Sequence, residues 1–217
     1  MGNQGIFIKA FIITAIEFGI GLYLGLQFSS AESDQLKQEL VAQQAQFSES
    51  RNTLLFFQTF QDTPGFCDSA PATVEPIVQN ARTLGDNINA LEKTQPYESV
   101  LELKKQYTTL LAEEWLYVVQ LKKACPEKRF QTVLFFYTNK PGDCPQCKEQ
   151  GSILWNIQKE SNNRLWVFSF EYNLDFGIVN ATKKQFSVTK PLTIIVDENT
   201  VIEGFKTKAE LEPYFAA

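Results

Sequence analysis

The chain of 217 residues contains no histidine, one methionine and only four cysteines. The lack of imidazole and thioether ligands argues against a metal-binding or copper-delivery module. Net charge is −5 and no basic run occurs, so nucleic acid is not an expected partner. The sequence also contains no internal repeat and no glycine-rich loop of the kind that cradles phosphate. The cysteines are therefore the candidate residues for a chemical function.

Two of the four cysteines form a single Cys-x-x-Cys motif, Cys144-Pro145-Gln146-Cys147. The motif follows the apolar run 132–137, predicted to be a strand, and precedes a predicted helix over 148–160. A helix N-terminus carries partial positive charge and free N–H groups, which favour thiolate over thiol. The motif therefore predicts thiol–disulfide exchange, with Cys144 as the attacking thiolate and Cys147 as the thiol that resolves the mixed disulfide. Such exchange requires no metal and no organic cofactor.

Downstream of the motif, the apolar pattern predicts alternating strands and helices. The predicted elements are a strand at 163–170, a helix at 179–186, a turn and strand over 187–196, a hairpin turn at 197–200, a strand at 201–205 and a helix at 208–215. This order resembles the thioredoxin fold, an α/β fold, over residues 129–217.

The resemblance to thioredoxin-like proteins implies disulfide exchange with protein substrates. It also implies that Pro191 opens the third strand with a cis peptide bond, beside the cysteine pair. Thr189, Lys190 and Pro191 would bind an extended substrate segment, whose main chain pairs with them as an added strand. Asp143 stands where the family usually has tryptophan. The direction of electron flow therefore stays open.

Lys190 is the charged residue that immediately precedes the expected cis proline. If its ammonium faces Cys144, it favours the thiolate and makes the cysteine couple more oxidising. The alternative is a solvated charge with no effect on the thiol.

Apolar residues at helical spacing predict three helices before the cysteine motif, over 32–60, 73–91 and 99–125. Short connections favour an up-down-up three-helix bundle. In this bundle Cys67 and Cys125 lie at the same pole, which predicts a structural disulfide between them. Two buried free thiols, or a relay that passes oxidation to Cys144, are the alternatives. A zinc site built from all four cysteines is disfavoured by their spacing.

The N-terminal stretch 6–28 contains thirteen isoleucine, leucine or phenylalanine residues, interrupted by Lys9 and Glu17. Its length and composition predict a transmembrane helix. A cleaved signal peptide is the alternative, since Ser29, Ser30 and Ala31 suit a cleavage site. The predicted organisation is an anchor at 1–31, a helical bundle at 32–126 and a thioredoxin-like domain at 127–217. Gly21 and Gly25 suggest docking to a membrane-bound redox partner.

The sequence as a whole predicts a single-pass protein of the cell membrane, with extracytoplasmic soluble domains and thiol–disulfide oxidoreductase activity. The alternative is a non-enzymatic scaffold with a thioredoxin-like fold, in which the Cys144–Cys147 pair is a static disulfide.

Overall fold

The computed structural model describes residues 11–21, 45, 48–49, 51–162 and 164–215, apart from the side chains of residues 75 and 76. The chain divides into two compact units, Met1–Asn52 and Thr53–Ala217. In the first unit, residues 11–21 are helical and exposed. The second unit contains a mixed sheet with helices on both of its faces.

The predicted transmembrane helix is corrected by the structure. No helix among the described residues is long and apolar enough to cross a membrane. Within the predicted span, residues 11–21 are described and are helical. The remaining residues of the predicted span, 6–10 and 22–28, lie outside the described residues. The prediction of a single-pass protein of the cell membrane depended on that helix and is corrected with it.

The sheet of the second unit has four strands in the order β2-β1-β3-β4. The strands are β1 (Gln131–Tyr137), β2 (Leu165–Glu171), β3 (Thr193–Val196) and β4 (Thr200–Glu203). β1 runs parallel to β2 and antiparallel to β3, and β3 and β4 form an antiparallel hairpin. β1 is a continuous apolar run because, as an inner strand, it is buried on both faces.

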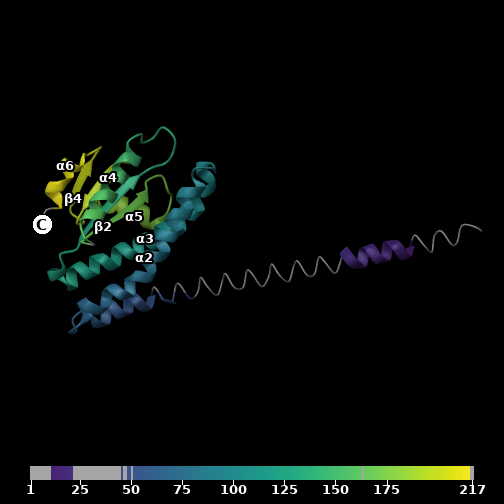
Figure 1. The fold of residues 1–217 in the computed structure, drawn as a ribbon, viewed down its shortest axis with the longest axis horizontal. Helices are drawn as coiled ribbons and strands as arrows, with labels where there is room; N and C mark the ends of the chain where they lie inside the picture. Colours follow the sequence, from purple (N-terminus) through teal and green to yellow (C-terminus); the bar gives the residue numbers. More distant parts are fainter. Residues whose placement is uncertain (1–10, 22–44, 46–47, 50, 163, 216–217) are drawn as a thin grey trace, which may run out of the picture. The chain divides into compact units, whose positions relative to one another are not determined.

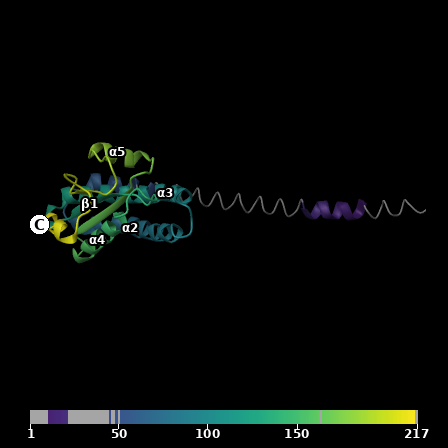
Figure 2. The same ribbon diagram turned by 90° about the horizontal axis from the view of Figure 1, so that it is seen from above.

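Helices cover both faces of this sheet. The α-helices after residue 60 are α2 (Phe66–Leu91), α3 (Leu101–Ala124), α4 (Cys147–Glu160), α5 (Gly177–Gln185) and α6 (Lys208–Leu211). Short 3₁₀ turns lie at Tyr97–Val100, Pro126–Lys128 and Glu212–Tyr214. One apolar core joins α3 and α5 to the sheet, and a second joins α4 and α6 to its other face. Figure 2 shows α5 and α4 on opposite sides of β1.

From β1 onward, the order of the elements is the order expected from the sequence (Figure 1). The helices before β1 differ from expectation. α2 begins at Phe66 rather than at residue 73, after Gly65 turns the chain with φ of 81°. The helix continues through Pro71, although proline lacks the N–H of a regular helical turn.

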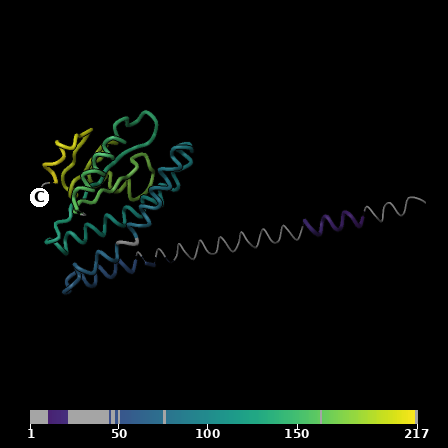
Figure 3. The backbone as a smooth tube through the Cα atoms, viewed as in Figure 1, coloured from purple at the N-terminus to yellow at the C-terminus, as the bar shows by residue number. Residues whose placement is uncertain are grey.

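α3 does not belong to a separate helical bundle. Leu111 and Trp115 of α3 share one core cluster with Phe136 and Phe170 of the sheet. On its other side, α3 packs along α2 (Figure 3). A third apolar cluster, separate from the two that flank the sheet, contains Phe57 and side chains of α2 and α3. The predicted boundary between residues 126 and 127 therefore falls within a continuously packed unit.

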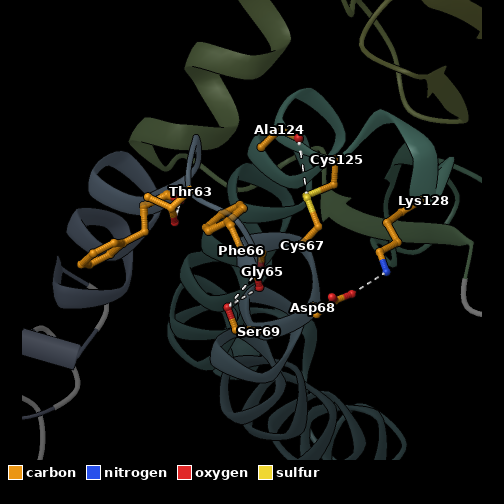
Figure 4. The surroundings of a disulfide bond; sticks show 10 residues. Thr63, Gly65, Phe66, Cys67, Asp68, Ser69, Ala124, Cys125 and Lys128 are labelled. Carbon is orange, nitrogen blue, oxygen red and sulfur yellow. Dashed lines mark hydrogen bonds and ion pairs between the residues drawn. A yellow bond between two sulfur atoms is a disulfide. The ribbon is translucent and has the colours of Figure 1, made fainter.

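A disulfide joins Cys67, in the first turn of α2, to Cys125, immediately after α3 (Figure 4). Cys125 is buried, with 1% of its surface exposed. A few residues away, Lys128 pairs with Asp68 at 3.1 Å. The start of α2 and the end of α3 lie together because the two helices are antiparallel neighbours. The two cysteines expected to pair are thus bonded to each other.

Removal of this disulfide should destabilise the second unit strongly. The bond links residues 58 positions apart, for which loop-closure entropy gives about 4 kcal/mol. We expect the Cys67→Ala/Cys125→Ala variant to lose about that much free energy of unfolding in urea titrations. The matched control is Cys144→Ala/Cys147→Ala, which opens a loop of sequence separation 3 and should lose only about 1.5 kcal/mol. Equal losses in the two variants would contradict the assignment.

At its C-terminal end, α3 is held by a salt-bridge cluster at the β3–β4 turn. The ammonium of Lys122 contacts Asp197 at 2.5 Å and Glu198 at 3.0 Å. Both acidic residues have positive φ, 50° and 56°, an unfavourable backbone conformation for residues with side chains. Trp115 also donates a hydrogen bond from Nε1 to Glu198. The lysine therefore stabilises a strained turn and joins that turn to the helix.

Replacement of Lys122 by methionine should lower the free energy of unfolding by about 1–3 kcal/mol, because partly buried acceptors lose a charged donor. Lys105→Met is the control. Its pair with Glu102 is exposed, and an exposed pair contributes at most about 0.5 kcal/mol. Urea titrations followed by circular dichroism measure both losses. A Lys122→Met protein as stable as the control would refute the role of the cluster.

Candidate active site

Two consecutive turns place the cysteine pair between β1 and α4. In the first, the Asp143 N–H donates to the Lys140 carbonyl, and Gly142 has φ of 87°. Pro141 followed by a glycine with positive φ is typical of a type II turn. In the second, the Cys147 N–H donates to the Cys144 carbonyl at 3.3 Å, with Gln146 at φ −96° and ψ −1°. These angles match the third residue of a type I turn, for which proline at the second position is favoured.

The second turn ends on the first residue of α4, so the two sulfurs lie at the start of the helix. Cys144 and Cys147 are joined by a disulfide. Cys147 is buried, with 2% of its surface exposed, whereas Cys144 is partly exposed. Cys144 is therefore the sulfur of the pair that is open to solvent, while Cys147 belongs to the core beneath α4.

Polar side chains from β1 and β2 hold the loop that carries Cys144. Thr138, buried just after β1, accepts hydrogen bonds from the Lys140 N–H and from Nδ2 of Asn173. Asn173 also donates to the Asp143 carboxylate at 3.1 Å. The Lys140 ammonium lies 3.8 Å from the same carboxylate. The negative charge beside Cys144, which would disfavour a thiolate, is thereby partly offset.

The expectation of a cis peptide bond at Pro191 is wrong, because the Lys190–Pro191 bond is trans. The next residue, Leu192, has φ of 59°, in the left-handed region. The Leu192 N–H donates to the Phe136 carbonyl at 2.7 Å, and its carbonyl accepts from the Gly204 N–H at 2.9 Å. These two bonds fix the entry to β3. Leu192 and Cys144 pack against the same core cluster.

Lys190 and Thr189, the other two predicted substrate-binding residues, contact residues of the chain itself. The ammonium of Lys190 pairs with Glu203 of β4 at 2.8 Å, and both side chains are about half exposed. This pairing reduces the positive charge that Lys190 could direct to a thiolate. The exposed Thr189 accepts a hydrogen bond at its carbonyl from the Tyr172 hydroxyl.

A buried charge cluster lies at the ends of β1 and β2. Lys104 of α3, 1% exposed, contacts Glu92 at 2.6 Å and Glu171 at 2.7 Å. Asn139, which follows β1, donates to both carboxylates, from its N–H to Glu171 and from Nδ2 to Glu92. The rings of Tyr97 and Tyr137 each lie 5.4 Å from the ammonium. The cluster joins α2 and α3 to the loop that leads to Cys144.

The tyrosines of this region stay protonated well above neutral pH. Burial, and next the charge of Glu171, raises the pKa of Tyr137 well above its usual value. The same two causes raise the pKa of Tyr97, where Asp143 adds a smaller effect. These hydroxyls are therefore neutral neighbours of the cluster.

Four residues of this region, Lys104, Glu171, Thr138 and Asn173, were not predicted from the sequence. A usable signal was present at Glu171, a lone carboxylate that ends the apolar run 165–170. An acid at the end of a buried strand requires a partner. No comparable signal marks Lys104, because its partners are remote in sequence.

Among the described residues, one group of three ligand atoms lies close enough together for a metal ion, contributed by Cys67, Cys125 and Glu127 within 4.8 Å. Its two sulfurs are bonded to each other, so neither is a thiolate ligand in this state.

Comparison with protein-family models, with curated proteins and with solved structures finds no match to this chain.

Replacement of Lys104 by methionine should cost about 3–5 kcal/mol of unfolding free energy, because Glu171 is left buried without its cation. The second replacement in Lys104→Met/Glu171→Leu should recover part of this loss, since it removes the more deeply buried of the two carboxylates that pair with Lys104 and leaves only Glu92, which is 17% exposed, without its cation. Thermal and urea unfolding measure both variants, with Lys105→Met as the control. An additive loss in the double variant would rule out the coupling.

Proposed function

We propose that the chain is a thiol–disulfide oxidoreductase of the thioredoxin-like class that exchanges disulfides with protein substrates. The observation that carries the proposal is the pairing of a partly exposed Cys144 with a buried Cys147 at the first residue of a 14-residue helix. The order of strands and helices around the pair agrees with the order on which the resemblance to thioredoxin-like proteins is based.

In the reducing direction, the Cys144 thiolate attacks one sulfur of a substrate disulfide. The substrate S–S bond breaks, a mixed disulfide forms, and the first substrate thiolate leaves. The Cys147 thiolate then attacks Cys144, which releases the second substrate thiolate. The substrate gains two electrons and the cysteine pair becomes the disulfide present in the structure. Oxidation of a substrate dithiol is the reverse sequence.

The helix start supplies a setting that favours the attacking thiolate. The first turn of a helix has N–H groups without intrahelical partners, and the dipole of α4 adds partial positive charge at its start, where Cys147 lies. Glu149 in that turn opposes this effect, as does Asp143. Asn173 and Lys140 both contact the Asp143 carboxylate. Exchange chemistry requires a partly ionised thiol rather than a fully ionised one.

A purely structural role explains the Cys144–Cys147 bond poorly. A bond between residues three positions apart removes little conformational freedom from the unfolded chain. The Cys67–Cys125 bond spans 58 positions and contributes more. In addition, one sulfur of the short pair is partly exposed. The two disulfides of this chain are therefore suited to different roles.

Equilibration of the full chain with glutathione redox buffers tests the proposal. Mass spectrometry of alkylated thiols should place the reduction potential of Cys144–Cys147 above about −300 mV, and that of Cys67–Cys125 below it. The protein should also accelerate the reduction of insulin by dithiothreitol. With a substrate disulfide, reduced Cys147→Ser should accumulate a mixed disulfide at Cys144, because the resolving thiol is missing.

Cys144→Ser is the matched control and should form little mixed disulfide, since the remaining thiol is buried. A potential below about −300 mV for Cys144–Cys147, without turnover of insulin, would instead identify a static disulfide and a scaffold.

A further inference from the structure

A cavity of about 220 Å³ lies beside the free edge of β2. β2 is the end strand of the sheet, so only its edge toward β1 is paired. The strand contributes Trp166, Val167 and Ser169 to the lining, and α2, α3 and α4 contribute the rest. None of these side chains takes part in the proposed thiol exchange.

The direction of the main-chain groups along β2 follows from two hydrogen bonds. The Gln131 N–H donates to the Arg164 carbonyl, and the Tyr172 N–H donates to the Tyr137 carbonyl. In a parallel pair, alternate residues of a strand turn their N–H and C=O groups toward the neighbour. The even-numbered residues of β2 therefore face β1. Val167 and Ser169 turn theirs toward the free edge, where both residues line the cavity.

The cavity offers donors and acceptors at the spacing of an extended chain. The outward groups of Val167 and Ser169 are two residues apart, and no hydrogen bond joins them to another described residue. Nε1 of Trp166 is buried and has no hydrogen-bond partner among the described residues. Unpaired N–H groups of this kind bind carbonyl oxygens.

The rest of the lining is mixed: Arg82, Glu114 and Gln158 are charged or polar, and another part suits an apolar side chain. Val78 and Ala81 of α2 and Leu111 of α3 are buried apolar residues of the wall. Trp155 of α4 is 50% exposed, and the Lys159 ammonium lies 5.0 Å from the centre of its ring. Exposed aromatic rings beside an apolar recess are typical of surfaces that bind peptides.

We propose that this cavity binds an extended polypeptide segment of a partner protein. The main chain of the segment pairs with Val167 and Ser169 as a fifth strand, and one of its carbonyl groups accepts from Trp166. An apolar side chain of the segment enters between Trp155 and Leu111. Strand addition is favoured over a small ligand because the free groups repeat along the strand. The proposal is independent of the thiol chemistry and applies equally to a Cys144→Ala/Cys147→Ala protein.

The probe is the peptide acetyl-Thr-Val-Phe-Val-Thr-amide, added to the ¹⁵N-labelled full chain. Amide hydrogen exchange, read by NMR, should slow by at least about 10-fold at Val167 and Ser169, with little change at Phe168, which already bonds to β1. The same peptide methylated at every main-chain nitrogen is the control and should not bind. Equal binding of the two peptides would overturn strand addition, as would exchange effects confined to other elements.

Ser169→Pro and Ser169→Ala form a matched pair of variants. Proline removes the outward N–H without removing a bond to β1, so it should weaken peptide binding by at least about 10-fold, whereas alanine should not. Trp166→Phe keeps a ring but loses Nε1–H, and should also weaken binding. It provides a second test if the proline variant does not fold. Unchanged affinity in a folded Ser169→Pro protein, or in Trp166→Phe, would overturn the assignment.

Discussion

The packing of α3 against the sheet is the constraint on which the rest of this structure depends. β1 is buried on both faces and requires a helix on each. α4 covers one face. On the other, α5 has nine residues and extends for about 13 Å, too short to cover the sheet alone. α3, with 24 residues and a length of about 36 Å, supplies the missing cover.

Two lysines near the ends of α3 fix its position along the sheet. Lys104 meets Glu171 at the end of β2, and Lys122 meets Asp197 and Glu198 at the β3–β4 turn. A shift of the helix by one turn would leave charges without partners in a largely buried setting, which costs several kcal/mol. Apolar contacts between these ends tolerate a shift more readily, because they have no direction. The position of α3 along the sheet is therefore set by its ion pairs. The strength of its packing on the sheet comes from the burial of apolar side chains.

Structure that depends on local sequence could be predicted, whereas structure that depends on contacts between residues far apart in the chain could not. The alternation of apolar runs predicts the strands and helices after residue 129, and Pro141-Gly142 and Pro145 account for the turns around Cys144. The start of α2 was misplaced because helix propensity around Pro71 is poor, and packing against α3 overrides it. No local pattern reveals the trans bond at Pro191 or the hydrogen bonds of Leu192, which donates to the Phe136 carbonyl and accepts from the Gly204 N–H.

The cysteine loop is held by the same contacts that position α3. Thr138 and Asn139 follow β1 directly; Thr138 binds Asn173, and Asn139 binds the two carboxylates that hold Lys104. Glu92 and Glu171 therefore contact the segment that precedes Cys144, and Lys104 of α3 holds both carboxylates. A thiol that exchanges bonds with a protein substrate must stay at the helix start through changes of its own bonding. For the proposed exchange, the helices before the sheet supply part of that support, so they belong to the candidate site as much as to the core.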